Sequence, residues 1–158
     1  NVDNITLKLR TEVIHSPFYH YTHGLKKHDG NCQRIAHGHR SRIDILLDGQ
    51  VSEAEQSYWA KRWEDIYIAT QEDEIAYTER KITGSVAEPS AYLCFAYESS
   101  QGYFELIIPK SDCEVIDTDS TVECLAQYLL EEQKKRTPDS HCQVIAYEGV
   151  GKGAMVSE

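Results

Sequence analysis

Helical periodicity is confined to two stretches of this 158-residue sequence, and strand-like patterns surround both. The helices are predicted over residues 52–67 and from about residue 120 to residue 136. Two or three strands precede the first helix, a β-hairpin lies between the helices, and two strands follow the second. This order is typical of an α+β fold, in which antiparallel strands form a sheet with the two helices on one face. It excludes the alternating strand–helix order of parallel, nucleotide-binding sheets.

Capping residues and charge mark the ends of both predicted helices. Ser52 forms a Ser-x-x-Glu capping box with Glu55, which predicts the start of the first helix. Asp119 or Ser120 is the predicted N-cap of the second helix, which ends in a Lys-Lys-Arg run before Pro138. The apolar stripes of the two helices consist of Tyr58, Trp59, Trp63, Ile66 and Tyr67, and of Val122, Leu125, Ala126, Leu129 and Leu130.

Alternating apolar residues and β-forming side chains predict the strands. In the stretch that begins at His37, Ile43 and Ile45 are in phase. The sequence Ser-Ser-Gln-Gly at residues 99–102 separates two apolar runs and predicts a β-hairpin. Residues 71–90 are polar and are predicted to form a loop. The strands are predicted over residues 6–14, 18–25, 37–47, 92–97, 103–108 and 142–147.

Length, charge and hydropathy limit what the chain can be. The length predicts one domain over residues 1–158, with a loop and hairpin inserted at about 71–117. The net charge of −10 opposes nucleic acid and anionic membranes, so an anionic substrate would need a local basic patch. The sequence has no apolar run that could span a bilayer and no signal-peptide pattern. It begins with Asn1, which favours a fragment of a longer protein over a processed one.

Three histidines form a candidate metal site. His37 and His39 project from the same face of a strand, about 6.5–7 Å apart. His23 lies on the preceding strand-like segment, which a loop could fold antiparallel to them. Three imidazoles would leave one zinc position for water or substrate, as in catalytic zinc sites. The alternative is a strand end with exposed histidines, and the His-x-His pair alone favours it; the third histidine and a nearby cysteine favour the metal.

That cysteine is one of five: Cys32, Cys94, Cys113, Cys124 and Cys142. An odd number without a Cys-x-x-Cys pair argues against a disulfide framework and a zinc ribbon, and favours a reducing, cytoplasmic compartment. Cys32 lies in a loop near positive charge, where a thiol would be partly exposed and its pKa lowered. The alternative, a small buried apolar residue, suits Cys94, Cys124 and Cys142 better, and Cys113 receives no role.

The motifs resemble the 6-pyruvoyltetrahydropterin synthase and 6-carboxytetrahydropterin synthase family. The family has a strand ending in His-x-Leu, a loop with a reactive cysteine, a His-Gly-His strand, a second helix that starts with Thr and Glu, and a glutamate at the end of a late strand. The matching residues here, in the same order and over nearly the whole chain, are His23, Cys32, His37, His39, Thr121, Glu123 and Glu148.

The resemblance implies a T-fold whose subunits join their sheets into a barrel, with active sites at the interfaces of a homo-oligomer. It implies zinc held by His23, His37 and His39, and 7,8-dihydroneopterin triphosphate as substrate. Cys32 would take a carbon-bound proton, and Glu148 would bind the guanidine-like edge of the pterin. Thr121 and Glu123 are further candidate substrate-binding residues.

Each charged residue near the motifs could bind substrate or could simply lie on a solvated surface. Arg34 and Arg40, in a cluster with Lys26, Lys27 and Arg42, supply a local basic patch for the triphosphate, or form a solvated face. Glu148 lies close to glycines that let a flat ring approach, or is a solvated glutamate at a strand end.

One family feature is missing. The family has an Asp-His pair between its helices, whereas residues 71–117 contain no histidine. A preceding half of a tandem protein could supply the pair, which is the favoured explanation, or the chain could keep the pocket without the full reaction.

The leading hypothesis is therefore a zinc-dependent pterin synthase or lyase, with the 6-carboxy product of queuosine biosynthesis favoured over the 6-pyruvoyl product. The alternative is a non-catalytic zinc- and pterin-binding half-domain that completes a partner's active site. A structural zinc protein with a fourth protein ligand is the third possibility.

Overall fold

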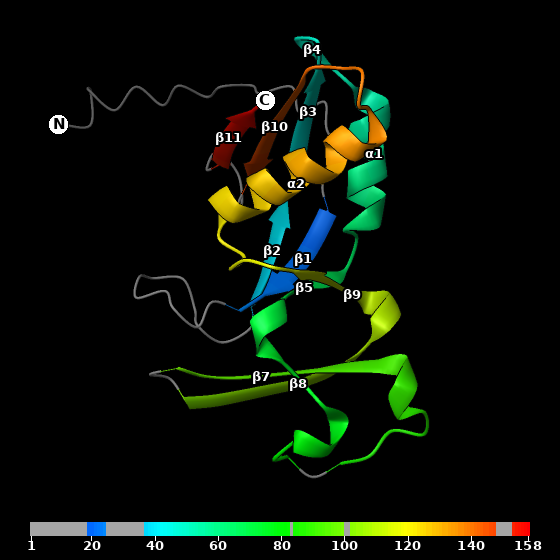
Figure 1. The fold of residues 1–158 in the computed structure, drawn as a ribbon, viewed down its shortest axis with the longest axis vertical. Coiled ribbons are helices and arrows are strands. Elements are labelled where there is room, and N and C mark those ends of the chain that lie inside the picture. The colour runs from blue at the N-terminus through cyan, green and yellow to red at the C-terminus, as the bar shows by residue number, and fades with distance from the viewer. Residues whose placement is uncertain (1–18, 25–36, 83, 100–101, 148–152) are drawn as a thin grey trace, which may run out of the picture.

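The computed structural model describes residues 19–24, 37–82, 84–99, 102–147 and 153–158, with only the backbone described for Tyr19, His20 and His37 (Figure 1). The predicted strand at residues 6–14 lies outside these ranges. No helix within them is long and apolar enough to cross a membrane. In this described part the fold is of the α+β class, with two α-helices and mainly antiparallel strand pairs.

The described strands form three sheets. The first has the order β2-β1-β5-β9 and contains β1 (Tyr19–His23), β2 (His37–Ser41), β5 (Ile66–Thr70) and β9 (Cys113–Ile116). The second has the order β11-β10-β3-β4 and contains β3 (Ile43–Leu47), β4 (Gln50–Val51), β10 (Cys142–Tyr147) and β11 (Gly153–Ser157). The third consists of β6 (Glu74–Ile75), β7 (Tyr92–Ser99) and β8 (Gly102–Pro109).

The expectation of a wholly antiparallel sheet is wrong for the first of these sheets. There β5 runs parallel to both β1 and β9. Parallel neighbours need a long crossover connection, and α1 (Glu53–Arg62) lies in the connection that leads to β5. The predicted strand at residues 37–47 is also divided, because β2 pairs with β1 whereas β3 pairs with β10. The chain passes from one sheet to the other at Arg42.

Both helices cover the same side of the second sheet. The helix α2 (Val122–Arg136) packs on β10 and β11, and α1 packs on β3 (Figure 1). Alternate residues of β3 and β10 face the helices, which places Ile43, Ile45 and Val144 in one core with Trp59 and Leu125. The prediction of two helices over one core is therefore confirmed.

The helix boundaries differ from the predictions at two points. The first helix ends at Arg62, so Ile66 and Tyr67 belong to β5 and not to its stripe. Asp65 has a φ of 52°, a left-handed conformation that turns the chain out of the helix. The second helix is capped by Thr121, whose hydroxyl accepts from the Cys124 backbone N–H, and not by Asp119 or Ser120.

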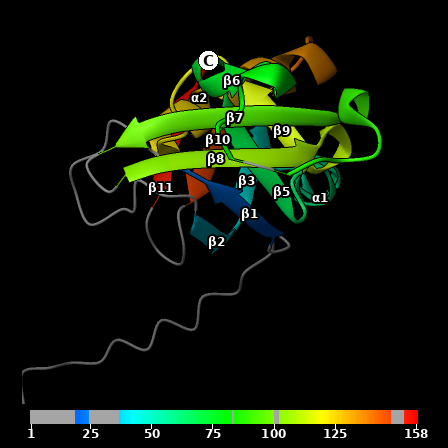
Figure 2. The same ribbon diagram turned by 90° about the horizontal axis from the view of Figure 1, so that it is seen from below.

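The predicted hairpin is present, formed by β7 and β8 between the two helices. It packs on β5 through a second core that contains Tyr67, Ala69 and Phe95 (Figure 2). The hairpin also contacts the end of β1, because a Cβ added to Gly24 would collide with the hydroxyl of Tyr97. The polar segment before the hairpin contains short 3-10 turns rather than a structureless loop.

Candidate functional site

Two of the three predicted metal ligands meet on the first sheet. The antiparallel register of β1 and β2 pairs Tyr21 with His39 and His23 with His37. The Nε2 atoms of His23 and His39 lie 3.0 Å apart, and the ring planes cross at 76°. The edge of the Tyr21 ring packs against His23 at a centroid distance of 5.4 Å. His23 is only 1% exposed, whereas His39 is partly buried, so the pair lies at the border of the interior.

The other nitrogen of His23 is anchored by the start of α2. Its Nδ1 lies 2.8 Å from the carbonyl oxygen of Ser120 and 2.9 Å from the Ser120 hydroxyl. A ring nitrogen held by a backbone carbonyl, with the other nitrogen aimed at the ligand position, is the usual arrangement of a metal-binding histidine. Ser120 and Thr121 thus bring the beginning of α2 to the histidine pair, a contact that the sequence pattern did not predict.

The two described donor atoms, Nε2 of His23 and Nε2 of His39, are placed as zinc ligands would be. Two nitrogens on one tetrahedral zinc lie roughly 3.3 Å apart, close to the 3.0 Å between the two Nε2 atoms. Among the side chains that the structure describes, no third His, Cys, Asp or Glu completes a metal-binding group. The predicted third ligand, His37, has its backbone directly opposite His23, and its side chain lies outside the described part.

The remaining predicted site residues are only partly placed. Cys32, Arg34 and Glu148 lie outside the described residues. Arg40 is exposed on β2, one position after His39, and Glu123 is exposed in the first turn of α2. Thr121 uses its hydroxyl to cap that helix.

A cleft of about 490 Å³ lies between the first sheet and the hairpin. Its lining includes Thr22, Gly38 and Arg40 from the sheet and Phe104, Leu106 and Ile108 from β8. Side chains alternate along a strand, so Thr22 and Arg40 point away from the face that carries the rings of His23 and His39. Tyr21 and His39, which lie on the face that carries the paired rings, also border the cleft.

Two of the described cysteines, Cys94 and Cys113, do not offer a reactive thiol. Burial raises the pKa of the Cys94 thiol, and burial together with Glu74 raises that of Cys113 to about 11. A thiol with such a pKa is protonated at neutral pH and is a poor nucleophile or base. Cys94 and Cys142 are buried as predicted, whereas Cys124 is only partly buried.

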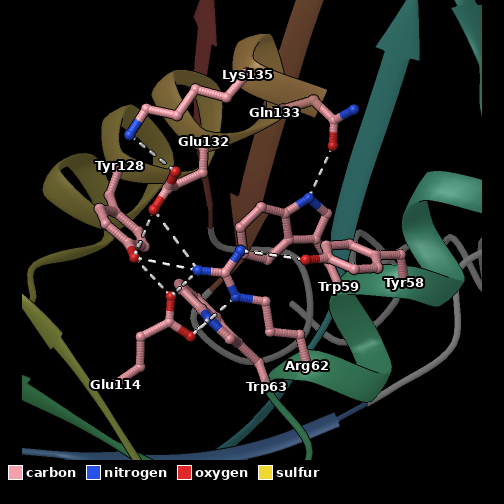
Figure 3. Close-up of polar contacts among 9 residues, drawn as sticks. All are labelled: Tyr58, Trp59, Arg62, Trp63, Glu114, Tyr128, Glu132, Gln133 and Lys135. Atoms are coloured by element: carbon pink, nitrogen blue, oxygen red, sulfur yellow. Dashed lines mark hydrogen bonds and ion pairs between the residues drawn. The ribbon is translucent and has the colours of Figure 1, made fainter. Parts of the chain in front are cut away.

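A polar network lies at the junction of α1, α2 and β9 (Figure 3). Glu114 accepts hydrogen bonds from Arg62 Nη2 at 2.5 Å, Trp63 Nε1 at 2.7 Å and the Tyr128 hydroxyl at 2.6 Å. Burial alone would lower the pKa of Arg62, but the hydrogen bond and charge of Glu114 outweigh it and raise that pKa. Burial, and then the hydrogen bond to Glu114, raise the pKa of Tyr128.

Glu114 of this network lies in residues 71–117, the stretch between the helices that contains no histidine and so lacks the family's Asp-His pair. Glu114 is a carboxylate between the two helices, but its oxygens are already held by Arg62, Trp63 and Tyr128. Trp63 also contacts Tyr21, at a centroid distance of 6.2 Å, and so connects the network to the aromatic neighbour of the histidines. Glu114 therefore has a structural role in joining three elements.

Comparisons with known sequences and structures identify the family and the fold of this chain. The sequence pattern of the family described as 6-pyruvoyl tetrahydropterin synthase matches residues 13–158. A Plasmodium vivax 6-pyruvoyltetrahydropterin synthase is 17% identical with a TM-score of 0.57, and the Plasmodium falciparum enzyme is 12% identical with a TM-score of 0.59. Each alignment covers 89% of this chain and 91% of the other. No curated protein sequence matches the chain. From the matched residues and the shared fold, the chain belongs to the 6-pyruvoyl tetrahydropterin synthase family.

Proposed function

We propose that this chain is a tetrahydropterin synthase that acts on 7,8-dihydroneopterin triphosphate. The observation that carries the proposal is the pairing of the buried His23 with the partly buried His39, whose Nε2 atoms lie 3.0 Å apart in a chain of this family. The alternative for His39, an exposed histidine at a strand end, does not agree with its partial burial or with its contact to the buried His23.

His23, His37 and His39 are the residues that would hold zinc. When bound, zinc supplies a Lewis acid that polarises the hydroxyl groups of the substrate side chain and makes the neighbouring carbon-bound protons more acidic. Nδ1 of His23, held by Ser120, keeps the ring oriented toward His39. The proposal is supported by this donor chemistry, since neutral imidazoles are common zinc ligands.

The other site residues are assigned by their chemistry. Cys32 is the proposed base that removes a carbon-bound proton, and Glu148 the proposed partner of the pterin's amino-pyrimidinone edge. Arg34 and Arg40 are proposed to bind the triphosphate, with Thr121 and Glu123 near the substrate. We further propose a homo-oligomer with sites between subunits and a cytoplasmic location.

The test is turnover of 7,8-dihydroneopterin triphosphate by the zinc-loaded protein, with the products separated by chromatography and identified by mass. We expect the substrate to disappear and a 6-carboxy- or 6-pyruvoyl-tetrahydropterin to form. Cys32→Ala should abolish turnover and leave the zinc content unchanged, whereas Cys94→Ala, at a buried thiol with a raised pKa, is the matched cysteine control. Substrate that stays intact in the presence of zinc would refute the assigned reaction.

A second candidate is a domain that binds zinc and pterin without completing the reaction. It is favoured by the lack of histidine in residues 71–117 and by the engagement of Glu114 with Arg62 and Tyr128. This candidate predicts pterin binding, measured by calorimetry, together with no product under the same conditions. Turnover by the chain alone would exclude it.

A further inference from the structure

Ser120 contacts the candidate metal ligand His23 across 97 positions of sequence. Both residues are almost fully buried, with Ser120 at 0% and His23 at 1% exposure. The carbonyl oxygen and the hydroxyl of Ser120 both lie within hydrogen-bond distance of the same atom, His23 Nδ1. Ser120 directly precedes Thr121, the N-cap of α2, so the helix fixes its backbone.

The carbonyl contact decides where the proton of His23 lies. A carbonyl oxygen only accepts hydrogen bonds, so Nδ1 must be the donor in the 2.8 Å contact. A neutral imidazole carries one proton, which leaves Nε2 of His23 with a lone pair. The 3.0 Å contact between the two Nε2 atoms then requires His39 to donate from its own Nε2. The two rings therefore hold different tautomers.

We propose that Ser120 is a positioning residue that holds His23 in the Nδ1–H tautomer, with its Nε2 lone pair already directed at the metal position. The metal part of this inference rests on the proposed function. The tautomer part does not, because it follows from contacts within the chain. Tyr21 assists through its edge-to-face contact with the ring, which limits rotation of His23.

The hydroxyl of Ser120 adds a second contact on Nδ1 at 2.9 Å. Removing the hydroxyl leaves the carbonyl contact that sets the tautomer, but it takes away one of the two contacts that keep the ring from tilting. Loss of a partner of this kind weakens metal binding by roughly 10–100-fold in metal sites generally. We expect Ser120→Ala to weaken zinc binding by about 10-fold, near the lower end of this range, because one of the two contacts on Nδ1 is retained.

The experiment uses the full chain with ¹⁵N-labelled histidine, freed of metal by chelation. Two-bond proton–nitrogen correlation spectra identify the protonated nitrogen of each ring, and His23→Gln assigns the His23 signal. The expected spectrum shows Nδ1–H for His23 and Nε2–H for His39 in the wild type. Ser120→Ala keeps the backbone carbonyl and should therefore keep the proton on Nδ1 of His23, but it should show a weaker zinc affinity in competition with a chromophoric chelator.

Ser52→Ala is the matched control, because it also removes a serine hydroxyl at a helix start, where that hydroxyl accepts from the Glu55 backbone N–H of α1. It should leave the tautomer and the zinc affinity unchanged, and Ser120→Thr, which keeps a hydroxyl, should bind zinc as tightly as the wild type. A wild-type spectrum with the His23 proton on Nε2, or equal zinc affinities for Ser120→Ala and Ser52→Ala, would overturn the inference. Correct tautomers without zinc binding would reject the proposed function while the role of Ser120 in setting the tautomer stands.

Discussion

Glu114 accepts hydrogen bonds from side chains of two helices and of the segment between α1 and β5, so its removal should be costly. In Glu114→Ala the partly buried Arg62 guanidinium, the Trp63 indole and the Tyr128 hydroxyl all lose an acceptor. We expect the free energy of unfolding to fall by about 3 kcal/mol, below the upper range for buried pairs because the Arg62 side chain is 28% exposed.

Urea denaturation at neutral pH measures this change. Glu114→Gln keeps an acceptor oxygen and should cost less than the alanine variant. Glu131→Ala, at an exposed glutamate of α2, should change the unfolding free energy by less than about 0.5 kcal/mol. Equal stabilities of Glu114→Ala and Glu131→Ala would show that the network does not support the fold.

At the residue scale, the sequence predicted which histidines would meet, but not which residues would hold their rings in place. The His-x-His spacing and the strand pattern were enough to expect His23 and His39 on neighbouring strands, and the structure brings them together. Ser120 was interpreted only as a possible helix cap, because capping is a local role. Its contact with His23 depends on how α2 docks beside β1, and no local pattern records that placement.

Thr121 has a structural task at the start of α2, whatever its role toward substrate. Its hydroxyl accepts from the Cys124 N–H at 3.3 Å and satisfies one of the unpaired donors of the first turn. Thr121→Ala should therefore lower the free energy of unfolding by about 1 kcal/mol, whereas Thr121→Ser should have little effect. Thermal unfolding followed by circular dichroism gives both values, and a neutral alanine variant would contradict the assignment of the cap.

At the element scale, the order of helices and strands was predictable, and several boundaries were not. The apolar pattern of the first helix predicts that it continues to Tyr67, yet residues Ile66–Thr70 form a fully buried strand. A short run of apolar residues fits both a helix and a strand buried on two sides, so periodicity alone could not separate them. The parallel pairing of β5 with β1 was also missed, because it arises from the crossover through α1.

The whole molecule should lose stability in alkaline solution. Burial, and then negative charge nearby, raise the pKa of Tyr67 above its ordinary range and that of Tyr97 to about 12. An unfolded tyrosine titrates near pH 10, so above that pH the unfolded chain releases protons that the folded chain keeps. This contribution is complete below about pH 10 and is lost as the pH rises toward the folded pKa values.

Urea denaturation between pH 8 and 12 tests this dependence. Each such tyrosine should contribute a decline of about 1.4 kcal/mol per pH unit above pH 10. Tyr67→Phe, which cannot ionise, should show a shallower decline than the wild type. Identical slopes for the two proteins would mean that Tyr67 titrates normally in the folded state.

Gly24, which follows β1, lies so close to Tyr97 of the hairpin that the side chains tolerated at these two positions depend on each other. Residue 24 follows His23, and Tyr97 belongs to β7, so the size of a side chain on the hairpin limits the size tolerated beside a candidate ligand. Replacing Tyr97 by Phe removes the colliding oxygen and leaves the nearest ring carbon at 3.0 Å from an added Cβ. Gly24→Ala should accordingly cost less stability in the Tyr97→Phe background than in the wild type. A hairpin with a side chain of another size at position 97 would therefore fit only if the residue at position 24 changed in size as well.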